Sequence, residues 1–393
     1  MIHYIARKNL MHRPLNALLS WVLLSAGVAI ISLLILLSEQ VRRQFEANIE
    51  GIDMVMGAKG SPLQLILSAV YQIDAPTGNI RYTEAQPWMR QRLVEKAIPL
   101  AYGDSYSGYR IVGTTPDYWE HYGADLAQGR AYSEDFEAVV GAKAAQRLGL
   151  SLGSTFFSVH GTGGEGEAHE HPYRVVGILS PTGKVVDNLI LCSLESVWHM
   201  HEHAEAGAEA AAQEITAVLF KFRSPMPVVQ WPRRVAESTD MQLVSPEVEV
   251  SRLLGLLGVG IEALTWLGWA IVALAALSVF VALYRALEER RYELALVRTL
   301  GASRGQVLWL LLYESLWLCL AGFVAGLLIS RVGLWAISQA AERELRLSAA
   351  EYGFRWAQEG GLLLIVLAIG LLAALLPAWK AYRIHIAQTL QYA

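Results

Sequence analysis

Four long apolar runs stand out against the mixed polar and apolar pattern of the rest of the chain. They cover residues 17–37, 264–283, 307–329 and 361–379. At a rise of 1.5 Å per residue, a helix of about 20 residues crosses the roughly 30 Å hydrocarbon core of a bilayer. The pattern therefore predicts four transmembrane helices, with both ends of the chain on the same side of the membrane.

Three basic residues precede the first run, as they do in a signal peptide: Arg7, Lys8 and Arg13. The run is longer than the apolar region of a typical signal peptide, and no cleavage site of small residues precedes residues 38–40. We interpret the run as a retained membrane anchor.

The placement of lysine and arginine predicts the orientation in the membrane. Five arginines lie between residues 285 and 304, whereas the loop at 332–358 balances three arginines with three glutamates. Positively charged segments remain in the cytoplasm. We expect a multi-pass inner-membrane protein with both termini and residues 285–306 in the cytoplasm and residues 40–252 in the periplasm.

The segment outside the membrane alternates short β-rich runs with turns and helical stretches. We predict strands at 79–82, 108–113, 155–160, 173–179 and 217–222, and helices at 138–150 and 193–213. Residues 38–50 and 247–263 lack strong helix breakers and are predicted to continue the first two spans outward as a stalk. The predicted fold is an α-helical membrane protein with four transmembrane helices and a large α/β extracytoplasmic domain between helices 1 and 2.

These elements divide the chain into three parts. Residues 1–39 hold the cytoplasmic N-terminal segment and helix 1, residues 40–252 form the periplasmic α/β domain with its stalk ends, and residues 253–393 hold helices 2–4.

Composition and charge exclude several classes of protein. Hydrophobic residues make up 54% of the chain and charged residues only 17%, which is far from a soluble protein. Two cysteines exclude a disulfide scaffold and a multi-cysteine metal centre. The net charge of −4 excludes a strongly basic nucleic-acid binder, so no nucleic-acid partner is expected.

Several stretches resemble the permease subunits of MacB/FtsX-type ABC transporters, which include the lipoprotein-releasing permeases. The sequence ERRYELALVRTLGASRGQV at 289–307 is similar to the cytoplasmic loop of that family, and LPAWKAYR at 376–383 is similar to its C-terminal signature. Residues 112–118 and 173–179 resemble its periplasmic core. The resemblance covers nearly the whole chain.

The resemblance implies that residues 288–306 contain a coupling helix that docks on a separate ATPase subunit. The residues expected to take part are Glu289, Arg290, Arg291, Glu293, Arg298, Gly301 and Arg304. The residues alone allow a second interpretation, a solvated loop whose charge only orients the protein.

The family also implies a mechanism and a set of partners. ATP and Mg²⁺ would bind to the ATPase subunit, because this chain has no Walker A sequence and is expected to be non-catalytic. Two permease copies, identical or different, would pair in the lipid membrane and convert ATP binding and hydrolysis into movements of the periplasmic domains. A periplasmic or outer-membrane partner fits the family but has no recognisable motif here.

Five histidines of the outer segment form two groups. His169 and His171 lie in a glycine-rich insertion, and His199, His201 and His203 lie on a predicted helix. Imidazoles four residues apart on a helix can bind Zn²⁺ together. Such a metal would be either the substrate, alone or in a complex, or a regulator of the protein. The alternative is a solvated surface with incidental histidines.

Gly322 and Gly326 form a small-xxx-small pattern in the third span. This pattern lets two membrane helices approach closely, although glycine is also frequent in spans without such a role.

A second function remains open from the sequence. The outer domain could sense a ligand or activate a periplasmic enzyme, which would make the chain a signalling or regulatory membrane protein.

Overall fold

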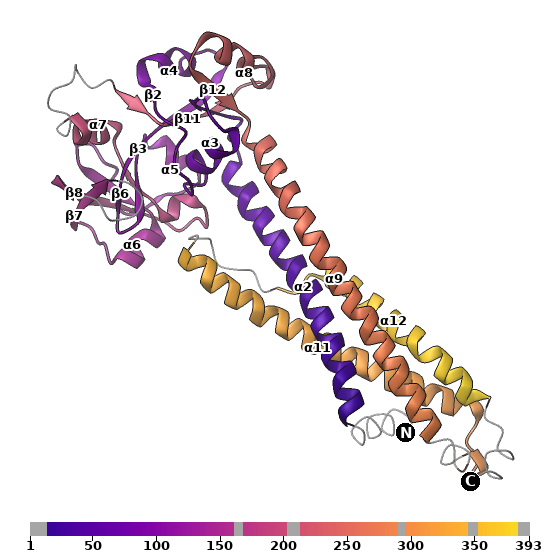
Figure 1. The fold of residues 1–393 in the computed structure, drawn as a ribbon. Helices are drawn as coiled ribbons and strands as arrows, with labels where there is room; N and C mark the ends of the chain where they lie inside the picture. Colours follow the sequence, from indigo (N-terminus) through magenta and orange to yellow (C-terminus); the bar gives the residue numbers. More distant parts are fainter. Residues whose placement is uncertain are drawn as a thin grey trace. The chain divides into compact units, whose positions relative to one another are not determined.

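The computed structural model describes residues 14–160, 168–202, 213–289, 296, 298–344 and 353–383. The chain forms two compact units (Figure 1). One unit comprises Met1–Val41, Leu256–Ala340 and Ala350–Ala393, and the other comprises Arg42–Gly255 and Ala341–Ala349. We call them the helical unit and the outer domain.

Four long helices carry the apolar runs: α2 (Pro14–Ile49), α9 (Pro246–Glu289), α11 (Arg304–Glu344) and α12 (Trp356–Tyr382). Within the described residues, these four are long and apolar enough to cross a membrane. The predicted four-span organisation is therefore confirmed. As predicted, helical structure also continues through residues 38–49 and 247–263.

Glycines bring α2 close to two neighbouring helices. A Cβ atom added at Gly268 of α9 would lie 2.7 Å from Cγ1 of Ile31, and one at Gly326 of α11 would lie 2.7 Å from Cβ of Val28. Gly322 is equally tight against Leu24 of α2. Because even a methyl group has no room at these positions, α2 packs closely against both α9 and α11.

The outer domain is built on a ten-stranded sheet in its described residues. The strands follow the order β12-β1-β11-β3-β4-β9-β6-β8-β5, and β7 pairs with β3 and β8. Most neighbours are antiparallel, whereas β4–β9 and β6–β8 are parallel. The strands of the sheet are β1 (Met54–Ala58), β3 (Val94–Tyr106), β4 (Tyr109–Gly113), β5 (Leu126–Gly129), β6 (Glu137–Val140), β7 (Thr155–His160), β8 (Ala168–Leu179), β9 (Ile190–Cys192), β11 (Ala217–Phe222) and β12 (Met241–Val244).

Short helices and one small ribbon complete the outer domain. The ribbon pairs β2 (Ile80–Arg81) with β10 (Glu214–Ile215). The helices are α3 (Pro62–Ala69), α4 (Tyr82–Met89), α5 (Asp117–His121), α6 (Ala142–Leu148), α7 (Leu194–Glu202), α8 (Met226–Ser238) and the 3-10 helix η1 (Val185–Asn188).

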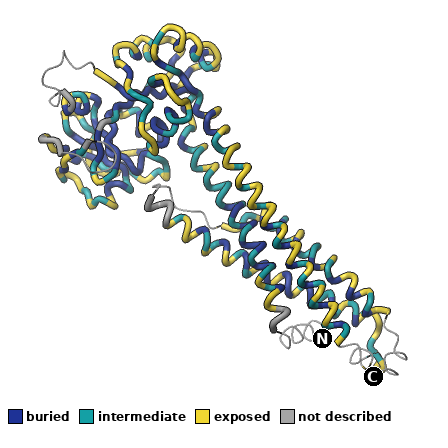
Figure 2. The backbone as a smooth tube through the Cα atoms, in the orientation of Figure 1, coloured by how far each residue is buried: buried dark blue, intermediate teal, exposed yellow. Residues whose placement is uncertain are grey.

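Both faces of the sheet are buried, which explains the continuous apolar runs of its central strands. Along β11, Val218 and Phe220 belong to one core cluster, while Ala217 and Leu219 belong to the other. Successive side chains of a strand point to opposite faces, so a strand covered on both sides is apolar throughout. The central strands are accordingly buried along their length (Figure 2).

Two local predictions need correction. Residues 138–150 are not one helix, because Ala138–Val140 belong to β6 and the helix α6 begins only after Gly141. Val139 and Val140 are fully buried and pair with β8 and β9, so sheet pairing prevails over the local helical pattern. The predicted strand at 79–82 is limited to Ile80–Arg81, and Tyr82 begins α4.

The predicted helix at 193–213 is confirmed over its described part. The helix α7 covers Leu194–Glu202, and residues 203–212 lie outside the described part of the chain.

A buried carboxylate organises the edge of the sheet. Glu137 is 2% exposed, and it binds Arg130 through two hydrogen bonds of 2.5 and 2.7 Å and Arg174 through one of 2.9 Å. The backbone N–H groups of Ser133 and Glu134 also donate to it. The Arg130 guanidinium is the main cause that lowers the pKa of Glu137 from 4.5 to about 2.

We predict that Glu137→Gln destabilises the outer domain at neutral pH by roughly 2–3 kcal/mol, because the ionised form is the one that the arginines bind. A lowered pKa stabilises the fold above the unfolded value of about 4.5, and this contribution is lost as the pH falls toward 2. Hydrogen exchange of the β6 and β8 amides in the full-length protein measures the effect. The exposed neighbour Glu134→Gln is the control, and equal exchange in both variants would contradict the prediction.

We predict that Gly326→Ala lowers the thermal stability of the full-length protein in detergent. The new methyl group must displace Val28, and such overpacking costs about 1–3 kcal/mol. Gly361→Ala in α12 is the matched control, since nothing lies within 4 Å of its added Cβ. A melting temperature of the Gly326 variant equal to that of the control would show that α2 and α11 do not require this glycine.

Candidate functional site

The described residues 296 and 298–301, between α9 and α11, form a capped helical turn. The helix α9 ends at Glu289, and residues 296, 298 and 299 are again helical. Gly301 ends this turn with a φ of +103°, a conformation that side chains disfavour and that is typical of a helix C-cap. Ser303 and Gln306 then form a reciprocal capping box at the start of α11, with hydrogen bonds of 3.2 and 2.8 Å.

Two leucines project from this turn into solvent. Leu296 is 47% exposed and Leu300 is 82% exposed, and a spacing of four residues places them on one helical face. Leu296 and Leu300 were not among the residues predicted to take part here. The available signal was two leucines spaced four residues apart in a stretch that also contains Arg298 and Arg304. An exposed apolar pair next to positive charge is suited to binding a complementary groove on another protein.

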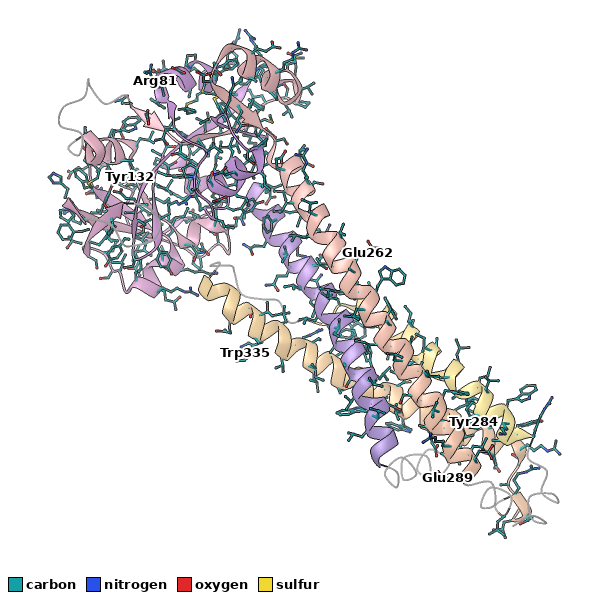
Figure 3. All side chains as sticks on the ribbon, viewed as in Figure 1. Arg81, Tyr132, Glu262, Tyr284, Glu289 and Trp335 are labelled. Carbon is teal, nitrogen blue, oxygen red and sulfur yellow. The ribbon has the colours of Figure 1, made fainter. Side chains whose placement is uncertain are left out.

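The predicted charged residues are only partly described. Glu289 is exposed at the end of α9, close to Tyr284 in the same helix (Figure 3). Arg298 is half-buried, and Arg304 is exposed with its guanidinium 5.9 Å from the centre of the Tyr382 ring. Arg290, Arg291 and Glu293 lie outside the described residues.

The end of α12 holds both flanks of this segment. The Lys380 ammonium binds the carboxylate of Glu288 and the hydroxyl of Tyr284, both in the last turns of α9. Tyr382 contacts Arg304, the first residue of α11. The stretch LPAWKAYR therefore fixes the two ends of the turn that carries Leu296 and Leu300.

The structure brings one histidine from each group to the same loop of the outer domain. His199 of α7 lies 2.9 Å through Nδ1 from a carboxylate oxygen of Asp135. His171 of β8 stacks on the neighbouring Phe136, with ring centres 5.3 Å apart. Asp135 was not predicted, because nothing in the sequence places residue 135 beside residue 199.

The described residues contain no group of three or more histidine, cysteine or acidic side chains that could hold a metal ion. His203 lies outside the described residues, and only the backbone is described for His169 and His201. The structure does show that the carboxylate of Asp135 orients the His199 ring.

Phe136, between these histidines, has an unusual backbone. Its φ is +61°, which is costly for an aromatic residue. Its N–H donates to the hydroxyl of Ser196, and its carbonyl accepts from the N–H of Arg174. These bonds, together with Glu137, hold the loop in the conformation that presents Asp135 and the Phe136 ring to the histidines.

Two protein-family models match the chain in adjacent parts. The MacB-like periplasmic core domain matches residues 17–230, and the C-terminal domain of FtsX-like permeases matches residues 266–386. The first match alone covers more than half of the chain. No curated protein sequence gives a significant match.

Two solved structures resemble about half of the chain. The periplasmic region of MacB from Actinobacillus actinomycetemcomitans shares 14% identity over 52% of this chain and 95% of its own, with a TM-score of 0.35. The extracellular domain of the noncanonic ABC-type transporter YknZ from Gram-positive bacteria shares 13% identity over 49% of this chain and 99% of its own, with a TM-score of 0.31. At these scores neither structure adds to the assignment.

The order of parts agrees with the two family models. One span and most of a large α/β domain fall within the first match, and most of the other three spans fall within the second. Four apolar helices and this domain combination make the chain a multi-pass inner-membrane protein with a periplasmic domain. It belongs to the MacB/FtsX-type family of ABC transporter permeases.

Proposed function

We propose that this permease converts ATP binding and hydrolysis by a separate ATPase subunit into movement of its periplasmic domain. The turn at 296–301 is the observation that carries the proposal, because it presents an apolar pair from a segment fixed at both ends. ATP and Mg²⁺ would bind to the partner subunit, and the termini would lie on the same cytoplasmic side as this turn.

Continuous helices support transmission of force. Both α2 and α9 run without interruption from the helical unit into the residues of the outer domain. A 36-residue helix is about 54 Å long, and its backbone hydrogen bonds make it stiff. Displacement at one end of such a helix is delivered at the other.

The polar groups of the spans favour this mechanism over a hydrophilic conduit. Ser20 bonds to Ser278, and Ser315 donates to the carbonyl of Gly370. These hydroxyls join one helix to another. The substrate would accordingly be handled at the periplasmic side.

A second permease copy, identical or related, completes the proposal. Gly255 and Gly258 of α9 have nothing within 4 Å of an added Cβ, and the neighbouring Leu256 is 68% exposed. Small residues beside apolar ones allow close helix–helix contact in a membrane.

We further propose that the histidines near the Asp135–Phe136 loop bind a metal ion or a metal complex in the periplasm. The Asp135–His199 hydrogen bond supports this proposal, since metal-binding imidazoles commonly donate their other N–H to a carboxylate. The five candidate ligands remain His169, His171, His199, His201 and His203, with Asp135 as the orienting group.

We predict that Leu300→Asp reduces co-purification of the ATPase with the full-length permease by more than about tenfold. Burial of a leucine contributes about 1.5–3 kcal/mol, and a carboxylate in an apolar groove costs further energy. Charge reversal of Glu289 and Glu293 is expected to weaken capture as well. Val229→Asp, which changes an 81% exposed valine of the outer domain, is the matched control. Undiminished capture by the Leu300 variant would remove the docking role.

We predict that the full-length protein in detergent competes with a chelator for Zn²⁺, and that changing all five histidines to alanine abolishes this competition. Asp135→Asn is expected to weaken affinity about 10- to 100-fold, as loss of an orienting carboxylate does. Asp125→Asn, at another exposed carboxylate, is the control. Equal Zn²⁺ binding by the wild type and the five-histidine variant would refute the metal site.

A further inference from the structure

A buried ionic network joins three helices of the helical unit. The carboxylate of Glu359 in α12 accepts hydrogen bonds of 2.7 Å from the guanidinium of Arg331 in α11 and of 2.7 Å from the hydroxyl of Ser32 in α2. Arg331 also donates to Ser32 and to Ser330, and these two hydroxyls lie 3.1 Å apart. One carboxylate thus contacts both α11 and α2.

Burial makes these contacts strong and hard to replace. Glu359 is 0% exposed and the Arg331 side chain is 19% exposed. A buried ion that loses its partner is left uncompensated, so each member requires the others. The two carboxylate oxygens accept bonds from Ser32, from Arg331 and from the backbone N–H of Arg355. The network is therefore organised to hold helices together.

A second ion pair repeats the link between α12 and α2. Arg355, the residue before α12, lies 3.4 Å from Glu39 of α2. Ser32 and Glu39 are seven residues apart, which places them on the same face of α2, two turns from one another. The start of α12 therefore contacts one face of α2 through two polar links.

The contact between α2 and α9 is of another kind. Those helices pack closely at Gly27 and Gly268, and a neutral hydrogen bond of 2.8 Å joins Ser20 to Ser278. Charge-assisted hydrogen bonds are roughly twice as strong as neutral ones. The helix α2 is accordingly held more strongly by α11 and α12 than by α9.

We propose that Ser32, Arg331 and Glu359 form a clamp that makes α2, α11 and α12 move as one body, so that α2 delivers displacement of α11 to the periplasmic domain. The inference rests on the proposed function and assigns positioning residues to it. The coupling turn precedes α11 in the chain, and α11 is the helix whose Arg331 binds the clamp carboxylate.

Ser32→Ala is the most specific variant, because it removes the hydrogen bonds from α2 to the network and leaves the Arg331–Glu359 ion pair in place. Ser25→Ala is its matched control. Ser25 is also buried in α2, but its hydroxyl bonds to the carbonyl of Val22 within the same helix. Glu359→Gln tests the carboxylate itself.

The measurement is a distance between spin labels at Glu46→Cys in two copies of the full-length permease with its co-purified ATPase. Glu46 is exposed on α2 within the outer domain, whereas Cys192 and Cys319 are buried and protected from labelling. Pulsed EPR gives the distance distribution with and without a non-hydrolysable ATP analogue. The ATPase rate of each variant is measured in parallel.

We expect an ATP-dependent distance change in the wild type and in Ser25→Ala. In Ser32→Ala and Glu359→Gln, the population that responds should fall about tenfold, the effect of one hydrogen bond to a charged group on an equilibrium, while the ATPase rate is retained. Loss of movement with retained hydrolysis is a result that general destabilisation would not produce.

The opposite outcomes separate the two proposals. A full response in Ser32→Ala, or an equal loss in Ser25→Ala, would overturn the clamp and leave the proposed function intact. A wild-type protein that hydrolyses ATP without any distance change would overturn the proposed function, and the clamp with it.

Discussion

The lipid bilayer imposes the constraint on which the rest of this structure depends. Within hydrocarbon every backbone N–H and C=O must be paired inside the protein, and an uninterrupted α-helix achieves this pairing locally. The helices α2 and α9 satisfy the requirement and then continue beyond the apolar runs, into the residues of the outer domain. The same backbone hydrogen bonds that permit insertion thus produce stiff connections between the membrane and the periplasm.

Specific contacts determine which of these helices are held to one another. Glycines let α2 approach α9 and α11, while Glu359 and Arg331 tie α2 to α11 and α12 by charge. At the other end of the bundle, Lys380 and Tyr382 hold the flanks of the turn with Leu296 and Leu300. The helix α12 therefore takes part in both arrangements, which gives its polar ends a larger role than anchoring in the membrane.

In the outer domain one buried carboxylate has effects beyond its own site. Glu137 binds two arginines and two backbone N–H groups, and these bonds help to keep Phe136 at a positive φ. That conformation places Asp135 beside His199 and the Phe136 ring on His171. A stable ion cluster in the fold thereby brings together histidines that belong to different strands and helices.

Several features follow from the sequence alone, because their causes are local. Long apolar runs predict spans, Gly301 marks the end of a helical turn, and the motifs at 289–307 and 376–383 indicate the family. Other features depend on residues far apart in the chain. The sequence pattern at 138–140 is helical, yet pairing with β8 and β9 makes it a strand. The partners Ser32–Glu359 and Asp135–His199 are separated by 327 and 64 residues. Only tertiary packing brings such groups within hydrogen-bonding distance, since no local preference encodes a contact at that separation.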